Sequence, residues 1–171
     1  IPMAAGLAYS EKINKSEKII CLFIGDGTFG EGILYETLNI ISKKKLPILI
    51  IVEDNLISQS SITQEIIPGK IENKIRAFEI KSISLNYPDV FELQKSTKNI
   101  INEVRNCIPH CLIIKSNRLA PHSKGDDTRT QNEISKLYEN DTYLKSKNVI
   151  QKDEKIKKME EENEKFIDLL F

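Results

Sequence analysis

Residues 18–27 read KIICLFIGDG, an unbroken apolar run that ends in two glycines on either side of an aspartate. Such a run predicts a β-strand that is covered on both faces, as in parallel sheets. A second apolar run, ILIIVEDN at residues 48–55, follows a segment with helical spacing over about Glu31 to Ser42. Strand, helix and strand at this spacing predict a βαβ unit and therefore a parallel sheet.

Apolar spacing and the positions of proline predict the elements around this unit. We expect helices over about Met3 to Lys12, Asp89 to Asn106 and Asn132 to Glu139, a third strand over Cys111 to Lys115, and a polar loop over Ser116 to Arg129. Asp89 follows Pro88 and is expected to cap its helix. We therefore predict one α/β domain over residues 1–171, a three-layer parallel sheet with helices on both faces.

The two ends of the chain carry further patterns. Residues 1–8, IPMAAGLA, open inside an apolar helix without a polar lead-in, so we expect that an upstream part of the domain is missing and that the chain is a fragment or a processed product. In the charge-rich tail, residues 152–171, apolar side chains recur at helical spacing. This pattern predicts a C-terminal surface helix with one packed face, formed by Ile156, Met159, Phe166 and Leu170.

Composition narrows the class of protein. Lys+Arg and Asp+Glu both number 25, so there is no basic excess to favour a nucleic-acid partner. No apolar run approaches the roughly 20 residues that cross a bilayer, and we predict a cytoplasmic protein without a membrane partner. Cys21, Cys107 and Cys111 are expected to be reduced core residues, and Pro109 and the strand at Cys111 argue against a zinc site with His110.

Polar side chains follow the first two predicted strands. Asp26 and Asn55 come at the carboxyl ends of parallel strands, where ligands of open α/β sheets bind. Backbone amides at such an end favour phosphate, and an acid beside phosphate makes sense when a divalent cation lies between them. Gly-Asp-Gly alone is a common turn, but the second oxygen-rich strand end favours a magnesium site. Neither a Walker loop nor a dinucleotide fingerprint fits the sequence.

The stretch from Gly25 to Asn55 resembles the thiamine diphosphate motif. The residues that carry the likeness are Gly25-Asp26-Gly27-Thr28-Phe29-Gly30-Glu31-Gly32, Tyr35-Glu36, Asn39, Leu46-Pro47 and Glu53-Asp54-Asn55. Residues 118–129, RLAPHSKGDDTR, resemble the second signature loop of the same family. The family is the alpha subunit of the thiamine diphosphate-dependent first component of 2-oxo-acid dehydrogenase complexes, of pyruvate, branched-chain or acetoin type. The resemblance implies a thiamine diphosphate-binding fold, here incomplete.

The resemblance also implies roles for single residues. Asp26 and Asn55 would bind magnesium by their side chains, and Ile57 would bind it by its backbone carbonyl. Gly27 and Thr28 would contact the diphosphate through their backbone. His122 would reach the cofactor and the reacting centre, and Arg129 would help to order the loop. Ser123 falls where some relatives carry a regulatory phosphoserine, and we make no such prediction here.

The implied activity is oxidative decarboxylation of a 2-oxo acid, or cleavage of acetoin, with transfer of the acyl group to a lipoyl group on the second component. A beta subunit would supply the glutamate that activates the aminopyrimidine, in an α2β2 assembly. Two departures stand out: Asp54 replaces the usual first Asn of Glu-Asn-Asn, and the family's chains are longer. Two alternatives remain, a transketolase-type enzyme, against which the Pro121-His122-Ser123 loop argues, and a non-catalytic truncated product.

Overall fold

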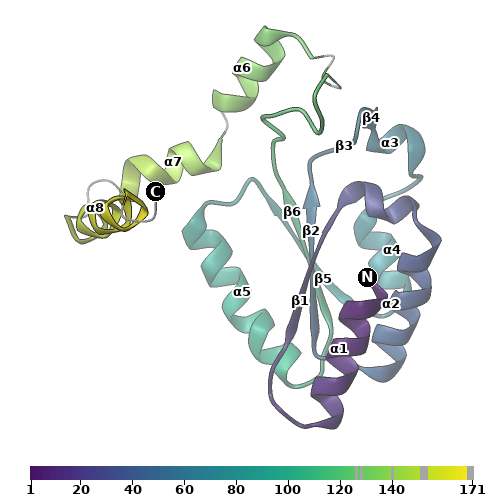
Figure 1. Ribbon diagram of the computed structural model, residues 1–171. Coiled ribbons are helices and arrows are strands. Elements are labelled where there is room, and N and C mark those ends of the chain that lie inside the picture. The colour runs from purple at the N-terminus through teal and green to yellow at the C-terminus, as the bar shows by residue number, and fades with distance from the viewer. Residues whose placement is uncertain (126, 128, 140, 151–153, 169–171) are drawn as a thin grey trace.

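The computed structural model describes residues 1–125, 127, 129–139, 141–150 and 154–168. Its centre is a four-stranded parallel sheet in the order β1-β2-β6-β5 (Figure 1). The strands are β1 (Ile20–Gly25), β2 (Ile48–Asp54), β5 (Lys81–Asn86) and β6 (His110–Lys115). The predicted parallel α/β sheet is confirmed, and β1, β2 and β6 are the three strands predicted from the sequence.

One face of the sheet is covered by α1 (Pro2–Ile13), α2 (Gly32–Lys44) and α4 (Ile71–Ala77) (Figure 1). These helices and the strands beneath them bury one large apolar cluster. Leu38 of α2, Ile50 of β2 and Ile75 of α4 are fully buried in it. The helices predicted at Met3 to Lys12 and Glu31 to Ser42 are therefore confirmed as α1 and α2.

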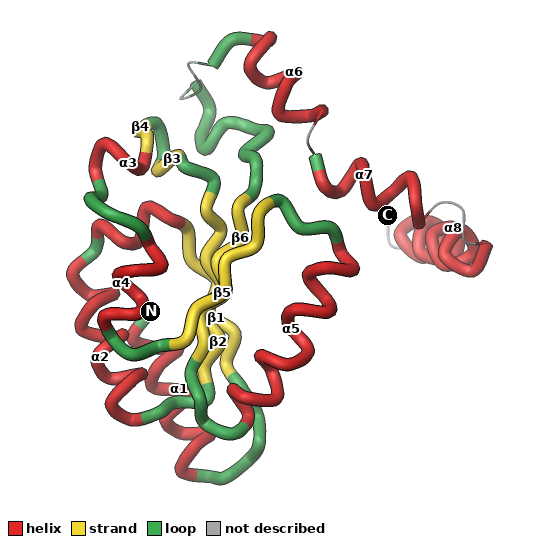
Figure 2. Tube along the Cα trace, turned by 180° about the vertical axis from the view of Figure 1, so that it is seen from behind, coloured by secondary structure: helices red, strands yellow, loops and turns green. Residues whose placement is uncertain are grey.

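On the opposite face, the long helix α5 (Val90–Arg105) lies against the sheet (Figure 2). The Asp89 carboxylate accepts a hydrogen bond from the Glu92 backbone N–H at 2.7 Å, which confirms the predicted cap. Ile100 and Val104 of α5 pack against a smaller buried cluster on β2, β5 and β6. Helices therefore lie on both faces, as predicted, but the second layer is much thinner.

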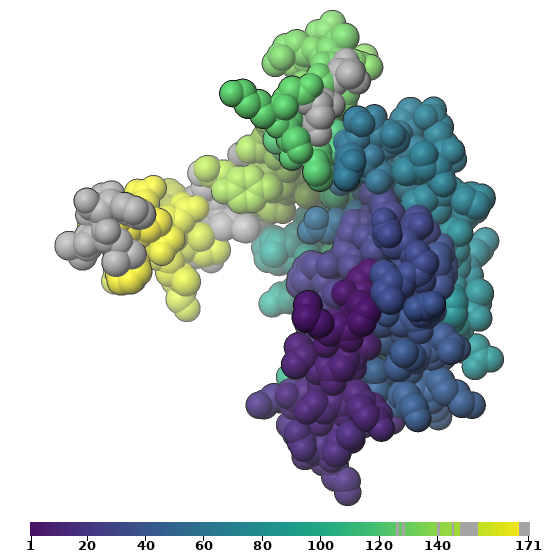
Figure 3. Space-filling model, turned by 45° about the vertical axis from the view of Figure 1, so that its right-hand side comes forward, coloured from purple at the N-terminus to yellow at the C-terminus, as the bar shows by residue number. Residues whose placement is uncertain are grey.

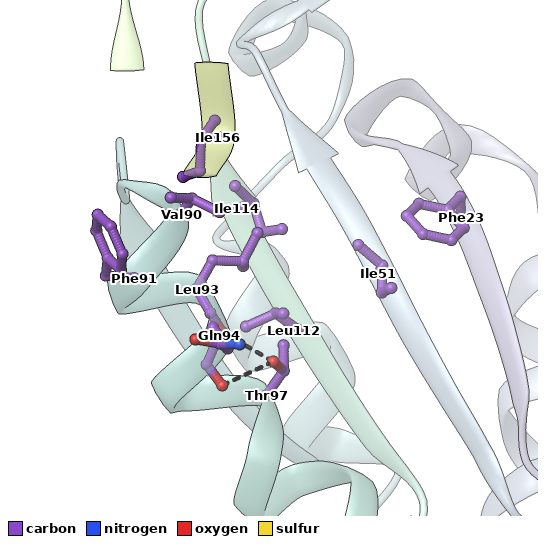
Figure 4. Close-up of a pocket in the computed structure, with 10 residues that line it drawn as sticks. All are labelled: Phe23, Ile51, Val90, Phe91, Leu93, Gln94, Thr97, Leu112, Ile114 and Ile156. Carbon is purple, nitrogen blue, oxygen red and sulfur yellow. Dashed lines mark hydrogen bonds between the residues drawn. The ribbon is translucent and has the colours of Figure 1, made fainter. Parts of the chain in front are cut away.

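Strand β1 is exposed on the α5 side, contrary to the prediction that both of its faces are covered. Phe23 is 63% exposed and Cys21 is exposed, because no described element lies over β1 on this face. An apolar groove of about 550 Å³ runs between β1 and α5, with Phe23 on one side and Phe91 on the other (Figure 4). The prediction that Cys21 is a core residue is wrong, while Cys111 is buried as expected.

Several short elements were not predicted. A hairpin of β3 (Ile57–Ser58) and β4 (Ser61–Ile62) follows β2 and leads into α3 (Thr63–Ile66). Strand β5, helix α4 and α7 (Thr142–Ile150) were also missed. Their sequences mix polar and apolar residues over too few positions for a period to stand out.

The C-terminal region consists of α6 (Gln131–Glu139), α7 and α8 (Glu154–Asp168), which project from the rest of the molecule (Figure 3). The helix predicted near Asn132 is confirmed as α6. Of the predicted packed face of the tail helix, Ile156 is half-buried and lines the apolar groove, Met159 and Phe166 are exposed, and Leu170 lies outside the described residues. Within the described part of the chain, no helix combines the length and apolar character needed to span a membrane.

Candidate cofactor site

The loops after β1, β2 and β6 meet at the carboxyl edge of the sheet (Figure 1). Gly25 pairs with Glu53, and Asp54 pairs with Lys115, so the three strands end almost level. Beyond them lie a turn of 3-10 helix, η1 (Asp26–Gly30), the β3–β4 hairpin and the loop that carries His122. The prediction that the Asp26 and Asn55 strand ends share one edge is confirmed.

Asp26 is the most buried acid at this edge, with 2% of its surface exposed. Its Oδ1 accepts a hydrogen bond from the Gly27 N–H at 3.0 Å, and its Oδ2 accepts one from the Thr63 hydroxyl at 2.5 Å. No basic side chain of the described residues forms an ion pair with it. A buried carboxylate without a cationic partner is costly, so this position favours a bound cation.

Gly27 is the point where η1 and the hairpin touch. A Cβ built on Gly27 would collide with the Ser58 side chain, whose own Cβ would be 2.8 Å away. The Tyr35 hydroxyl donates to the Phe29 carbonyl at 2.6 Å and so ties η1 to α2. The absence of a side chain at Gly27 therefore lets the hairpin approach the turn that carries the predicted diphosphate contacts, Gly27 and Thr28.

The remaining predicted metal ligands lie at the start of the hairpin. The Asn55 side-chain oxygen accepts a hydrogen bond from the Ile57 N–H at 3.1 Å, and Ile57 pairs with Ile62 in β3 and β4. An amide oxygen has two lone pairs, so Asn55 keeps one for a cation. The described residues contain no group of three His, Cys, Asp or Glu side chains that could hold a metal ion. The predicted magnesium ligands would not form such a group, because only Asp26 among them is of these residue types.

Asp54 adds a second acid to this edge. Burial and then the nearby charge of Asp26 raise the pKa of the Asp54 carboxyl, while the Leu56 N–H and Lys115 act in the opposite direction. The two carboxylates are thus close enough to repel each other. A divalent cation at Asp26 would oppose this repulsion.

His122 lies on an exposed loop with its Nδ1 3.0 Å from the Ser123 Oγ. Two arginines hold the described part of this loop. Arg129 donates to the Arg118 carbonyl at 2.5 Å and pairs with Asp127 at 2.5 Å, and its guanidinium lowers the pKa of Asp127 to about 2. Arg118 donates to the Gln59 carbonyl at 2.6 Å, which joins the loop to the β3–β4 hairpin.

The cysteine and histidine group at residues 107–111 lies at the opposite edge of the sheet. His110 Nε2 is 2.9 Å from the Glu103 carboxylate, and Glu103 also pairs with Lys81. Burial raises the pKa of the Cys111 thiol to about 12, which disfavours the thiolate that a metal would need. His110 links β6 to α5 through Glu103, whereas Cys111 packs in the cluster on the other face, and both lie away from the candidate site.

Comparison with known proteins identifies the family. The family model described as "Dehydrogenase E1 component" matches residues 1–169. The chain belongs to this family. It is 32% identical over 154 residues to the pyruvate dehydrogenase E1 component subunit alpha of Rickettsia typhi, covering 88% of this chain and 47% of that protein. With the same subunit from Acholeplasma laidlawii it shares 29% identity over 172 residues, covering 94% and 50%. The chain therefore spans about half the length of these relatives.

Solved structures of thiamine diphosphate-dependent enzymes share the fold of this family member. Transketolase from Campylobacter jejuni superposes with a TM-score of 0.55 at 25% identity, over 66% of this chain and 18% of the transketolase. A Mycobacterium smegmatis protein described as thiamin diphosphate-dependent gives a TM-score of 0.54 at 20% identity, over 68% and 22%. The predicted thiamine diphosphate-binding fold is confirmed.

Three residues of the candidate site were not singled out from the sequence. They are Ser58, Thr63 and the Arg118 side chain, which contact Gly27, Asp26 and Gln59. Ser58 belongs to the β3–β4 hairpin and Thr63 follows it at the start of α3, and these short elements show no periodic pattern in the sequence. Their only signal was a cluster of hydroxyl residues, at positions 58, 60, 61 and 63, shortly after the second oxygen-rich strand end.

Proposed function

We propose that this chain belongs to the alpha subunit of a first component that acts on a pyruvate-like 2-oxo acid or on acetoin. In this subunit it would hold the diphosphate and magnesium end of thiamine diphosphate. The observation that carries the proposal is Asp26, a buried acid without a cationic partner among the described residues, at a strand end that touches a second oxygen-rich turn. The match to the dehydrogenase E1 family over residues 1–169 favours this function over a transketolase-type one.

The chemistry of the donor set fits magnesium. A carboxylate from Asp26, an amide oxygen from Asn55 and a carbonyl from Ile57 are hard oxygen donors, and Mg²⁺ completes its octahedron with phosphate oxygens and water. The neighbouring acid Asp54 makes the edge more negative and so more attractive to a divalent cation. Gly27 and Thr28 stand at the start of η1, where their backbone would contact the diphosphate; at Gly27 this contact would compete with the hydrogen bond to Asp26 Oδ1.

When bound, thiamine diphosphate supplies the carbanion and the electron sink for cleavage next to the substrate carbonyl. The residues of this chain would anchor its charged end and shape the edge of the site. His122 would serve the reacting centre, since an imidazole ring nitrogen can accept or donate a proton. Arg118 and Arg129 would keep the described part of the His122 loop near the hairpin.

The proposal includes partners. A beta subunit would complete the active site in an α2β2 assembly, and a lipoyl-bearing second component would accept the acyl group. The relatives named as E1 component subunit alpha support this arrangement. We also propose a cytoplasmic location.

The test is cofactor binding by the protein together with its partner subunit. Asp26→Asn should weaken Mg²⁺-dependent binding of thiamine diphosphate, measured by isothermal titration, by at least about 10-fold, because losing even an outer-shell partner of a metal site costs that much affinity. Asp89→Asn is the control, since it keeps the helix cap of α5 and lies outside the site. Equal affinity of Asp26→Asn and the unchanged protein would refute the metal site. Normal cofactor binding, with neither decarboxylation of pyruvate or other 2-oxo acids nor cleavage of acetoin, would favour the non-catalytic alternative.

A further inference from the structure

Thr63 makes two contacts that join the two halves of the candidate metal site. It is a buried residue at the start of α3, directly after the hairpin. Its hydroxyl donates to Asp26 Oδ2 at 2.5 Å, and its backbone N–H donates to the Leu56 carbonyl at 3.0 Å. Leu56 lies between Asn55 and Ile57, the two proposed ligands of the hairpin.

The contacts at Asp26 leave room for a cation. Oδ1 takes one hydrogen bond from the Gly27 N–H, and Oδ2 takes one from Thr63. A carboxylate has about four lone-pair sites, so each oxygen keeps one free. The two donors hold both oxygens of the carboxylate and therefore fix the direction in which the free lone pairs point.

The backbone hydrogen bond of Thr63 holds the second half of the candidate metal site, the turn that carries Asn55 and Ile57. Because Thr63 N–H holds the Leu56 carbonyl, the segment from Asn55 to Thr63 closes on itself and the hairpin cannot move independently of Thr63. Thr63 thus links the Asp26 carboxylate to the hairpin that carries the proposed amide and carbonyl ligands, in addition to the close approach of Gly27 and Ser58.

We propose that Thr63 is a positioning residue, which orients the Asp26 carboxylate toward the divalent cation and sets the distance of the Asn55–Ile57 turn. The inference rests on the proposed function. Threonine serves because its hydroxyl donates without adding charge to an edge that already carries Asp26 and Asp54. Removal of the hydroxyl leaves Asp26 Oδ2 without its donor and lets the carboxylate turn.

The test compares Thr63→Val, which keeps the shape and removes the hydroxyl, with Thr63→Ser, which keeps the hydroxyl. Mn²⁺ affinity in the presence of thiamine diphosphate would be measured by electron paramagnetic resonance on the protein with its partner subunit. We expect about 10- to 100-fold weaker Mn²⁺ binding for Thr63→Val, the range typical of lost outer-shell partners, and near-normal binding for Thr63→Ser. Thr63→Ala is the second variant without the hydroxyl and should behave as Thr63→Val does.

Two controls separate the possible outcomes. Thr37→Val also removes a buried hydroxyl, which donates to the Ile33 carbonyl within α2, and should leave Mn²⁺ affinity unchanged. Asp26→Asn reports on the metal site itself. If Asp26→Asn weakens Mn²⁺ binding while Thr63→Val and Thr63→Ala lower only the melting temperature, the role of Thr63 is structural and the inference fails. If Asp26→Asn has no effect, the proposed function fails first.

Discussion

The two faces of the sheet are covered to very different extents. On one face, three helices and η1 bury a cluster that extends from Ala5 to Ile113. On the other, α5 packs on β2, β5 and β6, Ile156 of α8 lines the groove beside them, and Phe23 of β1 is left exposed. The η1 turn that carries Asp26 buries Phe29 in the larger cluster. The comparison shows that the candidate site is supported by the well-packed face, which α1, α2 and α4 cover, whereas the face covered by α5 contributes little to the geometry of the site.

The largest effect is expected from a core truncation on the packed face. Leu38→Ala in α2 removes a side chain with 0% exposure and should lower the free energy of unfolding by about 2–5 kcal/mol. Phe23→Ala on the open face should change it by less than about 0.5 kcal/mol, because the ring is largely in solvent already. Urea unfolding measures both. Equal losses for the two variants would show that the open face is covered in solution.

A smaller effect is expected at the contact between η1 and the hairpin. Gly27→Ala would force Ser58 away and should cost about 1–3 kcal/mol, with weaker thiamine diphosphate binding. Gly32→Ala is the matched control, since a Cβ at Gly32 meets nothing within 4 Å. Adding Ser58→Gly to Gly27→Ala should recover part of the loss. A Gly27→Ala variant with unchanged stability and unchanged cofactor affinity would contradict the close approach of Gly27 and Ser58.

The smallest effect concerns the thin layer itself. Asp89→Ala removes the cap of α5 and should lower stability by about 1 kcal/mol, whereas Asp89→Asn, which can still accept the hydrogen bond, should lose much less. Thermal unfolding would show the difference. Cofactor affinity should remain the same in both variants, because α5 takes no part in the candidate site. A change in affinity would mean that the two faces are coupled.

The sequence predicted the parts of the fold that have a clear period or a strong end signal. The runs at Ile20 and Ile48 became neighbouring strands, and Asp89 became the cap of α5. Strand β5 was missed because it contains only two apolar residues, Ile83 and Leu85, which are too few for an alternating pattern to stand out. The exposure of Phe23 could not be predicted from the sequence either, because an apolar strand has the same sequence pattern whether or not a second layer covers it.

For the candidate site, the sequence predicted which strand ends meet but not what holds them together. Asp26 and Asn55 follow from the parallel pairing alone. Thr63 and Ser58 make their contacts only after the chain turns back through a hairpin of two-residue strands. Such short hairpins leave no repeating pattern, so their side-chain contacts emerge only in three dimensions.

The link from Arg118 to the Gln59 carbonyl has a consequence for the thermodynamics of binding. Ordering a free backbone residue costs roughly 1–2 kcal/mol of conformational entropy, and a ligand that must order a loop loses that amount of affinity for each residue it fixes. Here Arg118 and Arg129 already restrain the described residues around His122 by hydrogen bonds within the chain. Much of the conformational entropy of this loop is therefore lost when the chain folds and not when a ligand binds. A molecule that binds beside the loop loses less affinity to the ordering of the loop.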